Sequence, residues 1–154
     1  MPASVVLSRS AFVVALFAAA AAQAGEPPQF LQSPDPGAAT LPFSEAVRSG
    51  DLLFLSGQIG TVPGKLELAT GGIAGESEQT LDNIERVLKR HGATMSDVVK
   101  CTVFLADIKE WPAFNEVYRR HFKAPYPARS ALAASGLAMN ARVEVECIAQ
   151  VSQR

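Results

Sequence analysis

Two short stretches near the end of the chain, Pro127-Ala128-Arg129-Ser130 and Val143-Glu144-Val145-Glu146, decide the predicted fold. Around the second stretch, residues 142–151 alternate apolar side chains with others, which is the period of a β-strand. The first stretch opens another extended run over residues 129–137. Asn140 lies between the two runs and suggests a reversal, so we expect them to be antiparallel neighbours in one sheet.

Arg129 and Glu144 are the charged residues of these runs that we expect to meet at the sheet edge. Pro127 keeps a helix from running through this point, because its ring fixes φ and removes a backbone donor. A guanidinium on rigid backbone suits a small carboxylate, since its planar fork of donors matches both oxygens. Taken alone, an arginine after a proline is more often a solvated surface residue. Arg129 and Glu144 become a candidate site only together with the other sequence motifs.

Two other segments carry helical periodicity. Residues 76–91 begin with acidic Glu76 and stop before Gly92, which agrees with the helix dipole and with a glycine cap. One face of this segment is apolar: Leu81, Ile84, Val87 and Leu88. Asp107 with Glu110 resembles the capping box of a second helix. Its expected buried face is Trp111, Phe114, Val117, Tyr118 and Phe122.

Further strands are predicted at residues 44–47, 52–59 and 98–105. The predicted order is therefore β-β-α-β-α-β-β, an α+β fold with a single sheet and two helices on one face. Residues 52–55 are apolar at every position, so both faces of that strand should be covered. Two helices cover only one face, and we therefore expect an oligomer to bury the other.

The first 24 residues are expected to be a secretory signal peptide, followed by a Pro-rich tail over residues 25–40 and one domain over 41–152. Arg9 precedes an apolar run at 11–22, too short to span a bilayer comfortably, and a small-x-small cleavage site ends at Ala24. The alternative is an uncleaved N-terminal anchor. Cleavage predicts a secreted or periplasmic protein.

The charge of the mature chain gives no sign of a nucleic-acid partner. Removing residues 1–24 takes one positive charge, Arg9, from a chain of formal net charge −1 and leaves −2. A mildly acidic domain without a Lys/Arg cluster lacks the electrostatic footprint of a nucleic-acid binder.

Two cysteines, Cys101 and Cys147, lie in predicted strands at positions that share the parity of apolar neighbours. The shared parity is consistent with the same side of the sheet, and an oxidising compartment would let a disulfide persist. A bridge also needs close Cα atoms, which the sequence does not establish. Free buried cysteines are the alternative, and the question stays open at this point.

Several enzyme classes find no support in the sequence. The two histidines, His91 and His121, fall near predicted helix ends, where capping or surface roles are usual. Two cysteines and two histidines at these spacings match no zinc pattern, and no phosphate-binding loop is present. Ser56 does not lie in a nucleophile elbow. We therefore expect neither a metal nor a cofactor.

The two opening stretches resemble the signature of the RidA family of enamine/imine deaminases. Three further stretches match that family in the same order, and together they cover residues 41–151: Phe43-Ser44-Glu45-Ala46-Val47, Leu55-Ser56-Gly57-Gln58-Ile59 and Val98-Val99-Lys100-Cys101-Thr102-Val103-Phe104-Leu105. The resemblance implies a chorismate-mutase-like fold and a homotrimer with ligand sites in the clefts between subunits. It also implies hydrolysis of enamines and imines, such as 2-aminoacrylate, to 2-keto acids and ammonia.

Carried over by position, the resemblance gives each site residue a role. Arg129 would grip the substrate carboxylate, and Glu144 would orient or activate the attacking water or relay its proton. The backbone at Ala131 would help to hold that water. The remaining pocket residues would be Ser56, Gly57 and Asn115, with Phe43 at the position of a family ligand contact.

Two positions depart from the family's usual pattern. Phe43 stands where many members have tyrosine, so a hydroxyl contact to the ligand is lost and substrate preference is open. Ala131 stands where cysteine is frequent, which matters little if that position acts through its backbone. Glu146 shares the parity of Glu144 but is not expected to share its role.

Three functions remain in view. The first is an imine deaminase in the cell envelope, separated by its signal peptide from the cytoplasmic dehydratases that produce 2-aminoacrylate. The second is a non-catalytic trimer that binds small carboxylates or acts like a chaperone through exposed apolar surface. The third is RNA cleavage, which some relatives are credited with and which the acidic balance disfavours.

Overall fold

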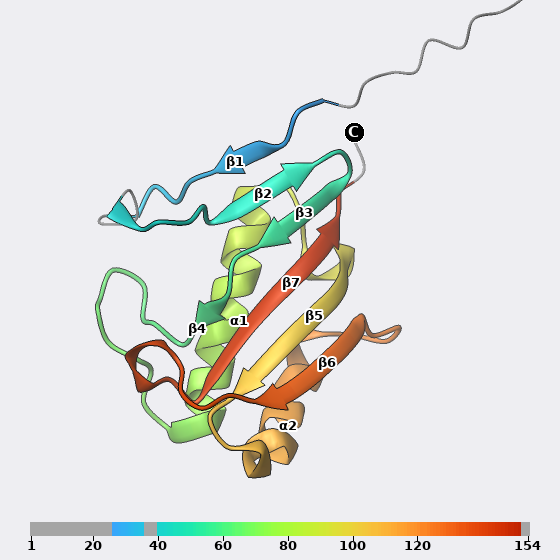
Figure 1. Ribbon diagram of the computed structural model, residues 1–154. Coiled ribbons are helices and arrows are strands. Elements are labelled where there is room, and N and C mark those ends of the chain that lie inside the picture. Colours follow the sequence, from blue (N-terminus) through green and yellow to red (C-terminus); the bar gives the residue numbers. More distant parts are fainter. Residues whose placement is uncertain (1–25, 36–39, 152–154) are drawn as a thin grey trace, which may run out of the picture.

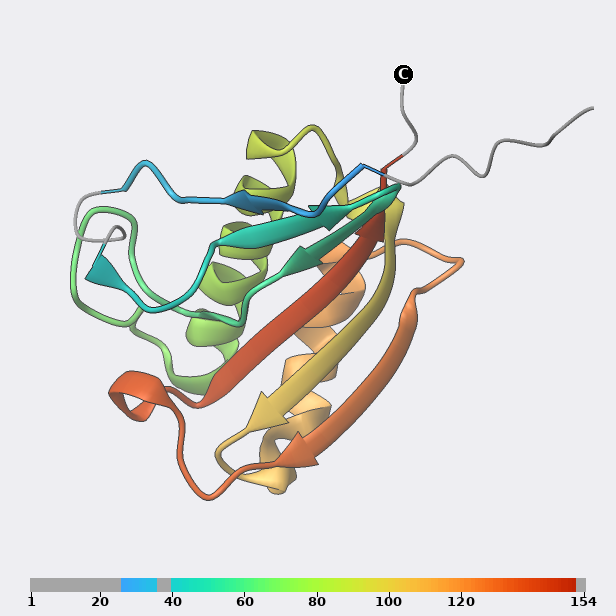
Figure 2. The ribbon, with the colours of Figure 1, turned by 45° about the horizontal axis from the view of Figure 1, so that its top comes forward.

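Two helices pack against each other on one face of a single β-sheet in the computed structural model, which describes residues 26–35 and 40–151 (Figure 1). Within these two ranges the opposite face of the sheet carries no α-helix, as the turned view in Figure 2 also shows. This confirms the predicted α+β class with both helices on one side of one sheet. The expected signal peptide, residues 1–24, lies outside the described residues.

The elements follow the predicted order, with one short strand added before the others and the strand predicted over residues 52–59 divided in two. The strands are β1 (Gln29–Leu31), β2 (Ala46–Ser49), β3 (Leu52–Leu55), β4 (Gln58–Ile59), β5 (Val98–Leu105), β6 (Ala128–Ala133) and β7 (Val143–Gln150). The helices are α1 (Gly72–Arg90) and α2 (Trp111–His121), with short 3₁₀ turns at Met95–Asp97, Ile108–Glu110 and Ala138–Asn140. Strand β1 falls within the expected Pro-rich tail and pairs antiparallel with β2, so part of that tail belongs to the sheet.

The order of strands across the sheet is β1-β2-β3-β7-β5-β6, with β4 also paired to β7. The prediction that the last two strands are neighbours is therefore wrong, because β5 lies between them. Strand β6 pairs in parallel with β5 after the crossover through α2, the usual connection for parallel strands. The short segment between β6 and β7 suggested a hairpin, but it passes over the end of β5. Ala134 donates its N–H to the carbonyl of Leu105 there, at 2.9 Å.

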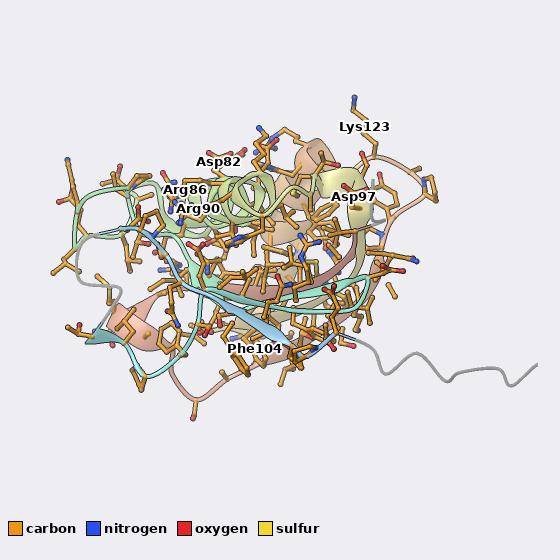
Figure 3. All side chains as sticks on the ribbon, turned by 90° about the horizontal axis from the view of Figure 1, so that it is seen from above. Asp82, Arg86, Arg90, Asp97, Phe104 and Lys123 are labelled. Carbon is orange, nitrogen blue, oxygen red and sulfur yellow. A yellow bond between two sulfur atoms is a disulfide. The ribbon has the colours of Figure 1, made fainter. Side chains whose placement is uncertain are left out.

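Alternate residues of each strand face the helices or the open face of the sheet. Arg129 pairs with Cys101, which is buried under the helices, whereas Glu144 pairs with Phe104. Figure 3 shows Asp82 on the helix side and Phe104 on the other side of the sheet. Because neighbours in one row of a sheet share a face, Arg129 and Glu144 project from opposite faces. The expectation that they meet within one chain is wrong.

Helix α1 begins four residues earlier than predicted, at Gly72, and its apolar face is buried as expected. Gly92 has a φ of 78°, a left-handed conformation that ends the helix without strain. Glu76 does not serve the helix dipole. It is 7% exposed, and its Oε2 accepts the backbone N–H of Arg142 at 2.8 Å, which ties α1 to the start of β7.

Helix α2 carries Pro112 in its first turn, as predicted. Its buried residues include Phe114, Val117 and Tyr118. Phe122, the residue directly after the helix, is buried as well. Trp111 differs from the expectation, because it is 41% exposed and lies at the start of the helix. Among the described residues, no helix is both long and apolar enough to cross a membrane.

The open face of the sheet exposes several large apolar side chains. They include Phe30, Leu52, Phe54 and Leu132. Strand β3 therefore buries Leu53 and Leu55 under the helices and leaves its other two side chains uncovered in the single chain. An apolar sheet face of this kind is typical of a surface that a partner covers.

A disulfide joins Cys101 of β5 to Cys147 of β7, which answers the question that the sequence left open. The two residues are direct partners in the strand register, and both are buried on the helix face. The bond closes a loop between residues 46 positions apart and includes β5, α2 and β6 in that loop. It therefore restricts the unfolded chain over the part of the protein that carries Arg129.

Replacing both cysteines should destabilise the protein without changing its fold. For Cys101→Ala combined with Cys147→Ala we expect the free energy of unfolding to fall by about 2–4 kcal/mol, through lost loop closure. Urea unfolding at a fixed protein concentration measures this, and wild type in reducing agent is the control. An unchanged midpoint in the double variant would contradict the stabilising role.

Candidate functional site

The Arg129 side chain is held against α2 by neutral groups. Its guanidinium carbon lies 4.5 Å from the ring centroid of Tyr118 and 5.8 Å from that of Phe114. Its Nη2 donates to Oδ1 of Asn115 at 2.7 Å. Within the described part of the chain no aspartate or glutamate pairs with Arg129. A half-buried positive charge without a counter-charge favours binding of an anion.

Asn115 is fixed by two donors. Its Oδ1 accepts from Arg129 and also from the indole Nε1 of Trp111, at 3.1 Å. With the amide oxygen engaged in this way, the NH₂ group of Asn115 is the part left to donate to a ligand. Trp111 thus orients Asn115 from the start of α2, a role that its expected place in the core did not suggest.

A cavity of about 250 Å³ opens beside Arg129. It is lined by Asn115, Tyr118, Arg119, Tyr126, Pro127 and Arg129. Asn115 and Arg129 were predicted from the sequence as site residues, whereas Arg119 and Tyr126 were not. The signal that would have found Arg119 is helical spacing, because residues three and four positions after Asn115 share its face.

Tyr118 forms the floor under the guanidinium. It is 4% exposed and stacks on Phe122, with ring centroids 4.4 Å apart. Burial raises the pKa of Tyr118 to about 12, against the opposing influence of the Arg129 charge. Tyr118 therefore stays a neutral phenol at physiological pH, and its ring supports Arg129 through a cation–π contact.

Glu144 lies on the open face beside Gly57. A Cβ atom built on Gly57 would overlap Oε1 of Glu144, so only glycine allows this approach of backbone to carboxylate. Burial, and in second place the negative charge of Glu146, raise the pKa of Glu144 above its ordinary value. The side chain of Glu144 therefore holds a proton at a higher pH than an exposed glutamate does.

Ser56 uses both its hydroxyl and its N–H to bond backbone carbonyls. Its Oγ donates to the carbonyl of Ser44 at 2.7 Å, and its N–H donates to the carbonyl of Glu45 at 3.0 Å. These bonds hold the turn before Gly57 against the segment that follows Phe43, a residue that is 53% exposed. Ser56 thus positions the backbone beside Glu144.

Ala131 lies two residues beyond Arg129 on β6, paired with Val103, and packs against the core. The seven residues named from the sequence therefore do not form one pocket in a single chain. Arg129 and Asn115 meet on the helix side of the sheet, whereas Gly57 and Glu144 meet on the open side.

Neither histidine belongs to the Arg129–Asn115 group or to the Gly57–Glu144 group. His91 Nε2 is 2.9 Å from Oε2 of Glu45, and His121 Nε2 is 2.6 Å from Oε2 of Glu78. Both histidines lie at the ends of helices, where they join one segment to another. In the two described ranges, no group of three or more His, Cys, Asp or Glu side chains is arranged to hold a metal ion.

Comparison with known proteins covers most of the chain. Residues 33–151 match the family model described as Endoribonuclease L-PSP. The chain is 41% identical over 112 residues to Reactive Intermediate Deaminase A, chloroplastic, of Arabidopsis thaliana, a match covering 73% of this chain and 60% of that longer protein. It is 43% identical over 107 residues to the 2-iminobutanoate/2-iminopropanoate deaminase of Dermatophagoides farinae, covering 70% and 84%.

Solved structures agree with these matches. A putative endoribonuclease from Thermotoga maritima superposes with a TM-score of 0.74 at 37% identity, covering 81% of this chain and 98% of that one. RidA from an Antarctic Psychrobacter species gives a TM-score of 0.74 at 34% identity, covering 80% and 99%. The chain therefore belongs to the endoribonuclease L-PSP family, which includes the RidA proteins that its motifs resemble.

Proposed function

We propose that this protein hydrolyses 2-imino acids, and the enamines that interconvert with them, to 2-keto acids and ammonia. The observation that carries the proposal is the half-buried guanidinium of Arg129, which lacks a carboxylate partner in the described residues and faces a small cavity. A substrate carboxylate supplies the missing negative charge. Relatives about 40% identical in sequence are named as deaminases of this class.

The reaction needs only water as co-reactant. Water adds to the imine carbon, a C–O bond forms, and the electron pair of the C=N bond moves to nitrogen, which takes a proton. The C–N bond of this adduct then breaks, ammonia leaves, and loss of the hydroxyl proton gives the keto acid. The imine carbon is already electrophilic, so the protein's task is to hold the carboxylate, place the water and move protons.

The side chains divide this work. Arg129 binds the carboxylate with the planar fork of its guanidinium, and the NH₂ group of Asn115 adds a donor beside it. Glu144 takes a proton from the attacking water and returns it to the leaving nitrogen, a task that suits a carboxyl group with a raised pKa. The backbone of Ala131 holds the water, and Phe43 and Gly57 line the pocket. Ser56 fixes the backbone before Gly57 through its bonds to Ser44 and Glu45.

Assembly is part of the proposal, because Arg129 and Glu144 project from opposite faces of one sheet. A ligand held by Arg129 of one chain therefore meets Glu144 only if a second chain supplies it. The uncovered apolar face, with Phe54 and Leu132 exposed, supports such packing. We infer a homotrimer with its sites between subunits.

Secretion to the envelope or medium is the location that we propose. The pattern of residues 1–24 supports it, with a signal peptide, a short Pro-rich segment over 25–40 and a domain over 41–152. The disulfide between Cys101 and Cys147 also supports it, because such bonds persist in oxidising compartments.

Two substitutions separate catalysis from binding. For Arg129→Ala we expect KM to rise by more than about tenfold, since a charged hydrogen-bonded anchor is lost. For Glu144→Gln we expect kcat to fall by about 100-fold while carboxylate binding is kept, because proton transfer alone is lost. The assay follows imino acids generated in situ by an amino-acid oxidase, using protein lacking residues 1–24.

Glu146→Gln is the matched control, because it removes a carboxylate from the same face and should keep kcat within about threefold on the plateau above the acid limb of the pH profile. Size measurements on each variant check that assembly is intact. If wild type only matches the uncatalysed rate over a varied panel of imino acids, the deaminase function is wrong and non-catalytic carboxylate binding becomes the function to test.

The pH dependence should report Glu144. Its pKa is raised, so the basic carboxylate is lost as pH falls through a value above that of an ordinary glutamate. We expect kcat/KM to fall on the acid side over that range. Removal of the neighbouring charge in Glu146→Gln should move the acid limb to lower pH. The uncatalysed rate at each pH is subtracted, and an unmoved limb would contradict the assignment.

Gly57→Ala tests the close approach to Glu144. The added methyl group overlaps the end of a flexible side chain, so the fold should persist while the carboxylate is displaced. We expect kcat to fall by about tenfold, because misplaced catalytic groups lose rate steeply. Gly136→Ala, whose Cβ would meet nothing within 4 Å, is the control. Full activity of Gly57→Ala, at an unchanged Tm, would remove Glu144 from the mechanism.

A further inference from the structure

We propose that the cavity beside Arg129 takes 2-imino acids that carry a second carboxylate on their side chain, and that Arg119 binds this second carboxylate. The inference names a substrate class and rests on the proposed deaminase function. Imines of this class arise when amino acids with an acidic side chain are oxidised at the amino-bearing carbon. The residues that line the cavity and its size support the inference.

Two arginine residues line one small space. Arg119 comes from α2 and Arg129 from β6, and both border the cavity of about 250 Å³. The other lining residues are neutral: Asn115, Tyr118, Tyr126 and Pro127. A monocarboxylate would neutralise one of the two positive charges and leave the other. A dicarboxylate matches both, which is the electrostatic complementarity expected of a specific site.

Arg119 is available for a ligand. Its Nη1 donates to Oε1 of Glu116 at 2.6 Å, but the two side chains are 59% and 69% exposed. Exposed pairs three residues apart on a helix contribute little, because solvent screens them and both side chains lose freedom. Exchange of Glu116 for a ligand carboxylate inside the cavity therefore costs little.

Arg120, the next residue, differs from Arg119 in its bonding partners. Arg120 has the same charge and nearly the same position in the chain, but it does not line the cavity. Its Nε donates to Oε1 of Glu78 at 3.0 Å, and its Nη1 donates to the carbonyl of Glu116 at 3.2 Å. Arg120 thus connects α2 to α1, whereas Arg119 borders the cavity. The two arginines form a matched pair for experiment.

The dimensions of the cavity agree with a short diacid. Its volume is below the range of about 300–1,000 Å³ that is typical of pockets for drug-sized ligands. The rings of Tyr118 and Tyr126 and the ring of Pro127 offer apolar walls for the carbon chain between two carboxylates. A chain of four or five carbons is the size class that we infer.

Binding of stable analogues tests the proposal directly. Calorimetry compares succinate with butyrate, which has the same number of carbons and one carboxylate. We expect wild type to bind succinate about fivefold more tightly or better, because a second charge-assisted bond forms. Arg119→Ala should lose this preference while its affinity for butyrate is kept. Arg120→Ala should keep the preference, and Arg119→Lys should keep part of it.

Three results would overturn the inference: no preference for succinate in wild type, an unchanged preference in Arg119→Ala, or equal losses in Arg119→Ala and Arg120→Ala. A kinetic arm compares imino acids made in situ from aspartate and from 2-aminobutyrate. Hydrolysis of both kinds with no dependence on Arg119 would also overturn it. Succinate binding through Arg119 without any hydrolysis would instead reject the deaminase function and leave the dicarboxylate site standing.

Discussion

The parallel pairing of β6 with the outer edge of β5 is the constraint on which the candidate site depends. It places Arg129 in the row of Cys101, under α2, and makes β6 an edge strand. The crossover through α2 brings Asn115 and Tyr118 over the same strand. Had β6 paired with β7 instead, Arg129 would have lain on the strand next to the one that carries Glu144 and Glu146. Strand order, rather than distance along the chain, therefore decides which groups surround the guanidinium.

The sequence predicted most elements because their signals are local. The apolar stripe of α1, the stop at Gly92 and Pro112 in the first turn of α2 all depend on residues within a few positions. The pairing of the last two strands was wrong because pairing is a long-range property, and the short segment between them imitated a hairpin. The disulfide stayed open for the same reason, since Cys101 and Cys147 meet only through the register of β5 and β7.

Site residues were predicted unevenly for a related reason. Arg129, Asn115, Gly57 and Glu144 came from motif resemblance, and the structure gives each a distinct environment. Trp111 and Tyr118 were expected in the core, because an aromatic residue on a helix face signals burial before it signals function. Trp111 instead donates to Asn115, and Tyr118 supports the guanidinium. Such supporting roles depend on three-dimensional contacts that periodicity does not encode.

The separation of Arg129 from Glu144 has a chemical consequence. If they were neighbours in one chain they would form an ion pair, which would lower the pKa of Glu144 and occupy the guanidinium. On opposite faces, Arg129 keeps its donors for an incoming carboxylate, and Glu144 keeps a raised pKa suited to proton transfer. A ligand bound where two chains meet would then lie between the two groups. If the site is divided between subunits, as proposed, the two groups come together only when the chains assemble.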